Sequence, residues 1–162
     1  MRRLIFILLL ASVSLLAACS YRTDFAVVNR SAHPVEVRYK TKGQTSNLSS
    51  NLPFAAGVPA KTSASQLNDV DSWQELAAGQ YQVERDLVRL TATATVRVMP
   101  GEALRITSIT EYDSYDDSSR AGFFPFEEIT VNGTDGELKL TGEQARKAFV
   151  RDSANLYTLT YK

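Results

Sequence analysis

The chain has 162 residues, of which 44% are hydrophobic and 22% charged, and its 18 basic residues equal its 18 acidic residues in number. This balance gives no electrostatic reason to expect nucleic-acid binding, and the hydrophobic content is that of a globular rather than a disordered protein. The single cysteine and single histidine exclude a disulfide framework and a zinc site made of Cys and His ligands.

The first nineteen residues have the anatomy of a secretory signal peptide. Arg2 and Arg3 give a positively charged start, an almost unbroken apolar run covers residues 4–16, and two alanines precede Cys19. The apolar run is shorter than the about 20 residues that a transmembrane helix needs. We therefore expect export of the chain rather than a membrane-spanning anchor.

The residues Leu16-Ala17-Ala18-Cys19 resemble the lipobox of bacterial lipoproteins. The resemblance implies that the Cys19 thiol receives a diacylglycerol, that cleavage occurs before Cys19, and that the new amino terminus is acylated. The alternative is an ordinary cleaved signal with a cysteine nearby by chance, but this cysteine is the only one in the chain and stands at the required position. By the family's sorting rule, Ser20 in place of Asp favours the periplasmic face of the outer membrane over the inner membrane.

The length of the chain suits a single domain after this signal. The predicted organisation is a signal peptide over residues 1–18, a lipidated tether over residues 19–24 and one domain over residues 25–162.

Two apolar segments predict the first strands of the domain. Residues 25–29 read Phe-Ala-Val-Val-Asn, and residues 35–40 alternate apolar with polar side chains. The turn between them, residues 30–34, contains a proline that cannot donate a ladder hydrogen bond. We expect the two strands to form an opening hairpin. The long polar stretch that follows has weaker strand signals at residues 49–54 and 62–67.

The clearest alternation is in residues 91–98, where Ala and Val alternate with Thr and Arg, and it resumes in residues 104–109. Between the two segments, Met99-Pro100-Gly101-Glu102 breaks the strand. β-branched residues with a period of two around a Pro-Gly turn predict a second hairpin.

The C-terminal part of the chain predicts a third hairpin, a short helix and a final strand. The hairpin turns at residues 132–136, and Thr141 with Gln144 resembles the capping box that begins a helix. The hairpin strands cover residues 129–131 and 137–140, the helix covers 142–149 and the last strand 156–161.

These elements amount to about seven to nine short strands and one short helix near the C-terminus. Closely spaced strands with frequent turns predict an all-β fold, an antiparallel β-sandwich with an immunoglobulin-like or transthyretin-like shape. The Cys–Trp–Cys signature of true immunoglobulin domains is absent, so that name describes the shape only.

Nothing in the sequence assembles a catalytic set. His33, the only histidine, lies in a turn before Pro34, where we expect a solvent-exposed side chain rather than a general base or metal ligand. No Gly-x-Ser-x-Gly motif supplies a serine nucleophile, and an acylated Cys19 is not one. Glu127 and Glu128 are adjacent on a strand, so they point to opposite faces and cannot flank one glycosidic bond. We therefore expect no enzymatic activity and no cofactor.

An acidic, aromatic segment at residues 111–126 is the sharpest concentration of charge in the chain. Its carboxylates could bind Ca²⁺, but their spacing does not match an EF-hand loop. A second interpretation is a hydrated loop at one end of the sandwich, and a third is a surface that grips a protein or a glycan, because binding residues concentrate on loops. The candidate contact residues are Tyr112, Asp113, Tyr115, Asp116, Asp117, Phe123 and Phe124.

Our first hypothesis is therefore a lipid-anchored cell-envelope protein, bound to the membrane through acyl chains on Cys19. Its domain would act as a non-enzymatic protein-binding or assembly module, with another envelope protein as partner. The alternative is a module that binds a small ligand, a glycan or Ca²⁺ through residues 111–126. Neither hypothesis involves nucleic acid.

Overall fold

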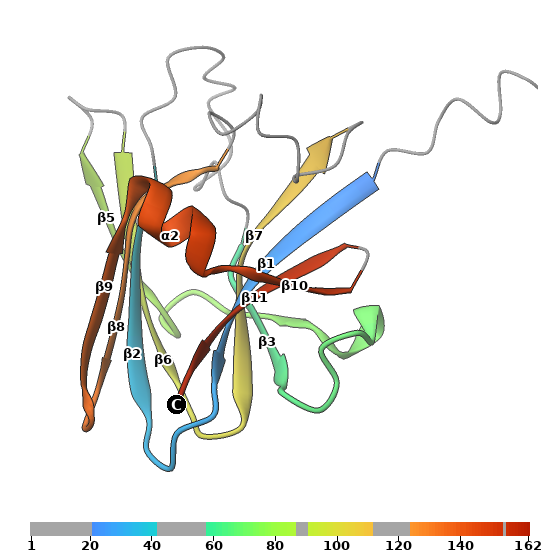
Figure 1. The fold of residues 1–162 in the computed structure, drawn as a ribbon, viewed down its shortest axis with the longest axis horizontal. Helices are drawn as coiled ribbons and strands as arrows, with labels where there is room; N and C mark the ends of the chain where they lie inside the picture. The colour runs from blue at the N-terminus through green and yellow to red at the C-terminus, as the bar shows by residue number, and fades with distance from the viewer. Residues whose placement is uncertain (1–20, 42–57, 87–90, 112–123, 154) are drawn as a thin grey trace, which may run out of the picture.

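The computed structural model describes residues 21–41, 58–86, 91–111, 124–153 and 155–162. In these residues two β-sheets pack face to face, and one seven-residue helix lies near the C-terminus (Figure 1). The predicted all-β sandwich with a short C-terminal helix is therefore confirmed. The described residues form eleven strands, more than the seven to nine expected, because the shortest edge strands carry no clear period of two.

The first sheet has six strands. They are β1 (Tyr21–Asn29), β3 (Ala60–Ser63), β4 (Gln74–Glu75), β7 (Glu102–Glu111), β10 (Val150–Ser153) and β11 (Leu156–Tyr161). Their order across the sheet is β10-β11-β1-β7-β3-β4, which places β1 in the interior. β1 pairs with β11 in parallel, whereas every other pairing in the described sheets is antiparallel, as expected.

The second sheet has five strands. They are β2 (Val35–Thr41), β5 (Gln82–Asp86), β6 (Thr91–Val98), β8 (Phe126–Gly133) and β9 (Gly136–Thr141), in the order β5-β6-β2-β8-β9. Helix α2 (Gly142–Ala148) connects β9 to β10 and so bridges the two sheets along one edge of the sandwich (Figure 1). We call the other edge, where β4 leads to β5, the open edge, because it carries no helix in the described part of the chain.

The core lies between the sheets and is made by the inward side of each strand. In β2, Val35, Val37 and Tyr39 are buried and belong to the core, whereas the residues between them are exposed or half-buried, as the alternation predicted. An aromatic cluster then joins the two sheets near α2. Its rings lie 5.4–5.9 Å apart between centroids and belong to Phe25, Tyr39, Phe124, Phe126, Phe149 and Tyr157.

Two of the three predicted hairpins are wrong. β1 and β2 lie in different sheets, and so do β6 and β7, so each connection crosses from one sheet to the other. Glu102 N–H donates to the Met99 carbonyl at 3.0 Å and Gly101 has a φ of +75°, as in a type II turn with Pro100 at its second position. Type I and II turns splay the flanking strands, and proline cannot adopt the positive φ that the tight hairpin turns need there. The turn therefore leads out of the sheet.

The third hairpin, the helix and the final strand are confirmed. β8 and β9 pair with Gly133 opposite Gly136, and α2 begins directly after Thr141. The capping box is not formed, because the Thr141 hydroxyl donates to the Gln144 side chain at 3.4 Å instead of accepting from a backbone N–H. β3 covers only the start of the strand expected at residues 62–67, and the strand expected at residues 49–54 lies outside the described residues.

Strand β1 begins before the predicted start at residue 25. β1 begins at Tyr21, and its residues as far as Asp24 pair in register with β7 between Glu111 and Ser108. Residues 21–24, which the sequence assigns to the tether, are therefore sheet residues. They pair with the C-terminal end of β7. The sequence pattern does not predict that these two segments are neighbours.

Asn29, the last residue of β1, forms hydrogen bonds with both the β1–β2 turn and the β6–β7 turn. Its side chain is fully buried. The Nδ2 group donates to the carbonyls of His33, at 2.9 Å, and Val98, at 3.1 Å, and Oδ1 accepts from the N–H and the hydroxyl of Ser31. The backbone carbonyl of Asn29 accepts from Gly101 N–H at 2.9 Å. One residue therefore holds both turns that cross between the sheets.

We expect Asn29→Ala to lower the free energy of unfolding by about 3 kcal/mol, because the buried Val98 carbonyl loses a donor and the turn through Ser31 and His33 loses the amide that holds it. Urea unfolding followed by circular dichroism measures the loss. Asn68→Ala, at an exposed position, is the control and should change stability by less than about 0.5 kcal/mol. Equal effects of the two substitutions would contradict the role assigned to Asn29.

Candidate functional site

The acidic, aromatic segment supplies no described contact surface. Cys19 and six of the candidate contact residues, Tyr112, Asp113, Tyr115, Asp116, Asp117 and Phe123, lie outside the described residues. Phe124 is described, and its ring is buried in the core, 5.8 Å from the ring of Phe25. The prediction that Phe124 contacts a partner is therefore wrong, because the ring is already covered by other aromatic side chains.

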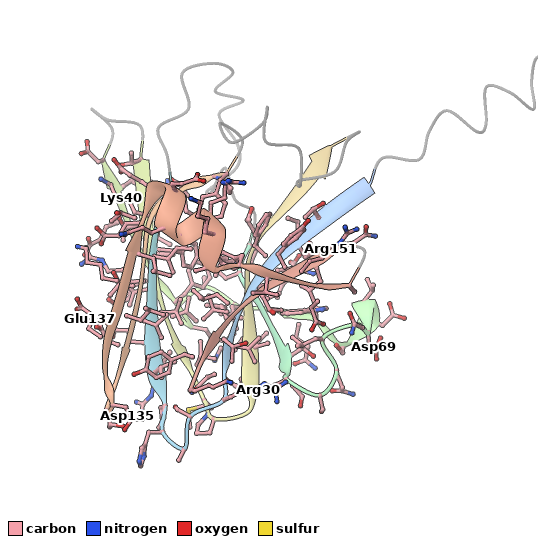
Figure 2. The ribbon with its side chains drawn as sticks, in the orientation of Figure 1. Arg30, Lys40, Asp69, Asp135, Glu137 and Arg151 are labelled. Atoms are coloured by element: carbon pink, nitrogen blue, oxygen red, sulfur yellow. The ribbon has the colours of Figure 1, made fainter. Side chains whose placement is uncertain are left out.

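His33 lies as the sequence predicted, exposed in the turn between β1 and β2, but the adjacent glutamates, Glu127 and Glu128, do not point to opposite faces. A register shift pairs Lys40 with Glu128 and Thr41 with Phe126, so both glutamates lie between two core residues, Phe126 and Ile129, on the outer side of β8. Lys40 lies near the opposite end of β2 (Figure 2), and its Nζ is 2.6 Å from Glu127, whereas Glu128 binds Lys139 at 2.9 Å. The two carboxylates bind different lysines and do not converge on one point.

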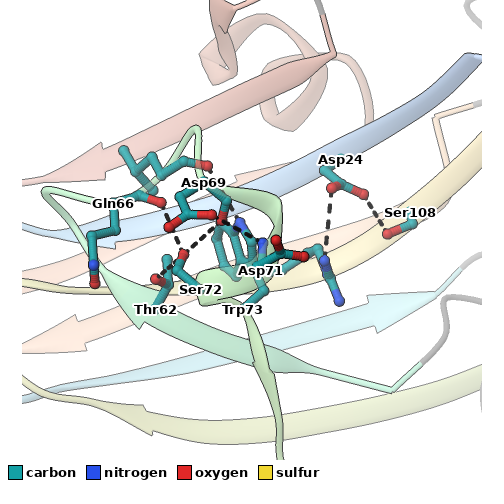
Figure 3. A network of polar contacts seen from close by, with 10 residues as sticks. Asp24, Thr62, Gln66, Asp69, Asp71, Ser72, Trp73 and Ser108 are labelled. Atoms are coloured by element: carbon teal, nitrogen blue, oxygen red, sulfur yellow. Dashed lines mark hydrogen bonds and ion pairs between the residues drawn. The ribbon is translucent and has the colours of Figure 1, made fainter.

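A polar cluster on the outer face of the first sheet brings Asp24, Arg105 and Ser108 together, and Figure 3 shows Asp24 beside Ser108. A guanidinium nitrogen of Arg105 lies 3.8 Å from one Asp24 carboxylate oxygen, and the Ser108 hydroxyl donates to the other. A bulge makes this arrangement possible. Asp24 and Ala26 are two residues apart in β1, yet their partners in β7, Ser108 and Arg105, are three apart. Without the extra residue in β7, Arg105 and Ser108 would point to opposite faces.

The segment between β3 and β4, which contains the short 3₁₀ helix η1 (Val70–Ser72), covers this cluster. The Arg105 guanidinium lies 5.3 Å from the centroid of the Trp73 ring, a cation–π contact. Trp73 Nε1 donates to the Leu67 carbonyl at 3.3 Å, and the hydroxyls of Ser72 and Thr62 are 2.6 Å apart. We assign the cluster a structural role, because its cation is paired, stacked and nearly buried.

A groove of about 470 Å³ lies at the open edge, between β3 and β4 of the first sheet and β6 of the second. Leu76 and Met99 form its apolar part, and Arg97 is its exposed cation. The other residues that line the groove are Lys61, Gln74, Glu75, Gln80 and Glu102.

The groove contains one neutralised ion pair and two charges that are not neutralised within it. Glu102 Oε2 accepts from Lys61 Nζ at 2.9 Å and from Met99 N–H at 2.8 Å. Burial raises the pKa of Glu102, but the Met99 N–H and the Lys61 ammonium outweigh it and hold the pKa below its usual value. Arg97 and Glu75, by contrast, have no ion-pair partner within the ranges that the structure describes. A ligand that carries both an apolar and a charged group would find a counterpart for each.

Neither the cluster nor the groove was found from the sequence. Arg105 lies between Leu104 and Ile106, so alternation predicts a solvent-exposed side chain there. The groove residues come from separate strands and connections between positions 61 and 102, and no local sequence pattern predicts that they lie together. The available signals were the single tryptophan in a polar segment and Met99, an apolar residue beside a Pro-Gly turn, and neither identifies its neighbours.

Within the described ranges, no group of three or more His, Cys, Asp or Glu side chains lies close enough together to hold a metal ion. Helices long and apolar enough to span a membrane are likewise absent from those ranges.

We expect Arg105→Leu to lower the free energy of unfolding by about 3 kcal/mol, because the Asp24 side chain, only 19% exposed, loses its cation. Urea unfolding measures the change. The double variant Asp24→Asn with Arg105→Leu should lose less than the sum of the two single variants, because the residues share one interaction. Arg85→Leu, at an exposed position, is the control. Additive losses would contradict the pairing.

Stability should also depend on the charge of Glu102. Because the pKa of Glu102 in the folded protein lies below its unfolded value, its stabilising contribution is present above the unfolded pKa and is lost as pH falls through the folded one. Glu102→Gln lacks this contribution. The difference in unfolding free energy between the wild type and Glu102→Gln should be constant at pH values well above the unfolded pKa of Glu102 and should shrink as pH falls through its lowered folded pKa. Lys61→Met should weaken that pH dependence, and a difference that does not change with pH would contradict the assignment.

Comparisons of the chain with protein-family models, with curated proteins and with solved structures give no significant match.

Proposed function

We propose that the protein is a lipid-anchored component of a bacterial cell envelope, held at the periplasmic face of the outer membrane by acyl chains on Cys19. Its β-sandwich acts as a non-enzymatic module that binds another envelope protein. The observation that carries the proposal is the short separation between the lipobox cysteine and the sheet. Only Ser20 stands between Cys19 and Tyr21, the first residue of β1.

This separation couples the anchor closely to the domain. Two residues of extended chain span at most about 7 Å, so β1 begins beside the lipid headgroups. Each buried methylene contributes about 0.8 kcal/mol to membrane binding, and several acyl chains together hold the protein firmly. Of the two ends of β1, Tyr21 is then the nearer to the bilayer and Asn29 the farther.

The position of the groove supports a binding role. Met99, which lines the groove, belongs to the turn that Asn29 fastens through Gly101. Arg30 and Asp135 lie at this same end of the molecule (Figure 2). The groove therefore opens near the end of β1 that is farther from the anchor, where a partner in the periplasm can reach it.

Cys19→Ser tests the anchor. We expect this variant to move from the membrane fraction to the soluble periplasmic fraction and to lose incorporation of an alkyne-labelled fatty acid, because the thiol that carries the diacylglycerol is gone. Ser20→Ala is the matched control and should remain in the membrane and labelled. A membrane-bound Cys19→Ser protein, or an unmodified Cys19 in mass spectra of the wild type, would overturn the proposal.

A further inference from the structure

The two edges of the sandwich differ in how they are covered. Along one edge, α2 bridges β9 and β10 and buries Ala145, with Phe149 beside it in the core. Along the open edge, the described chain passes from β4 to β5 without a helix, and the core there ends at Leu76, Tyr81 and Val83, which are only partly buried. The groove lies at this incompletely covered edge.

Strand β4 turns hydrogen-bonding backbone groups towards the open edge. Leu76 N–H donates to the Pro59 carbonyl at 2.9 Å, so the neighbouring antiparallel pair, Glu75 with Ala60, is the kind that does not exchange hydrogen bonds. The N–H and C=O of Glu75 consequently point away from β3. An extended chain placed along β4 would find one donor and one acceptor there, as in strand addition to a sheet edge.

The side chains of the groove define what such a chain would carry. Arg97 offers an exposed guanidinium, which suits a carboxylate through paired hydrogen bonds. Its register neighbour in β2 is Glu36, but the two make no ion pair within 4.0 Å in the described residues. Leu76 and Met99 offer an apolar surface beside Arg97. Lys61 adds little net charge, because Glu102 neutralises it at 2.9 Å, and the Glu75 carboxylate disfavours a second acid. The groove therefore suits a bound segment that carries one acidic residue next to an apolar residue.

We propose that the groove binds an extended segment of the partner protein, in which an acidic side chain pairs with Arg97 and an apolar side chain packs on Leu76 and Met99. This inference rests on the proposed function and specifies where and how the partner is held. A second copy of this chain and a partner that binds elsewhere are the competing outcomes.

Site-specific photocrosslinking in cells tests the inference with the full-length, anchored protein. A benzophenone amino acid replaces one exposed apolar residue at a time: Met99 in the groove, Val70 on η1 or Val150 on β10. These side chains are 44%, 74% and 67% exposed, so the two controls are at least as accessible as the test position. We expect an adduct from position 99 alone, and mass spectrometry should find the crosslinked peptide to contain an Asp or Glu beside an apolar residue.

Reversing the charge of Arg97 then tests whether the adduct depends on recognition of an acidic side chain or only on closeness of the two proteins. Arg97→Glu should reduce the position-99 adduct about tenfold, and changing the partner's acidic residue to Lys should restore it. Arg85→Glu, the same change at an exposed position of β5 outside the groove, should leave the adduct unchanged. Urea unfolding of both variants confirms that they are folded.

The remaining outcomes overturn the inference in distinguishable ways. Adducts only at positions 70 or 150 would refute the groove but keep a protein-binding role. An adduct between two copies of this chain at position 99 would refute the assigned occupant. A position-99 adduct that is insensitive to Arg97→Glu would refute the acidic recognition. The absence of adducts at all three positions would refute the inference and also count against the proposed function.

Discussion

The burial of β1 on both faces is the constraint on which the rest of the structure depends. Phe25 and Val27 point into the core, while Ala26 and Val28 are equally buried on the outer side of the sheet. A strand without a solvent-exposed face needs partners along both edges and cover on both sides. β7 and β11 supply the partners and the second sheet covers the inner side. The segment that ends at Trp73 contributes to the outer cover, which is why that side holds the buried Arg105.

Elements that depend on residues close together in the sequence could be predicted. The pairing of strands that are far apart in the sequence could not. The alternation in β2 and β6, the β8–β9 turn and α2 are local, and the sequence predicted each of them. The same alternation does not say which strand lies alongside, so β1 and β2 were paired wrongly. Pro100 is the residue that argues against a β6–β7 hairpin, because its fixed φ excludes the tight hairpin turns. The unbroken apolar run from Phe25 to Val28 likewise indicated a strand buried on both faces.

The candidate site shows the same division. Asp24, Trp73 and Arg105 meet only because β1, β7 and the segment before β4 share one face, and a bulge adjusts the register between them. The groove depends on the separation of the two sheets at the open edge, which no single segment encodes. Phe124 was misplaced for a different reason. An aromatic residue beside an acidic segment fits a contact surface and a core equally well, and only the packing against Phe25 decides between them.

The parallel pairing of β1 with β11 bears on how the protein reaches its native state. Asp24 lies opposite Leu156, about 130 residues away, and contacts at such separation form slowly because a long loop must close first. A chain synthesised amino terminus first exposes an apolar strand before its neighbour has been made. A slow, aggregation-prone interval before the first sheet closes follows from this topology, and a chaperone that holds the unfolded chain would suppress it.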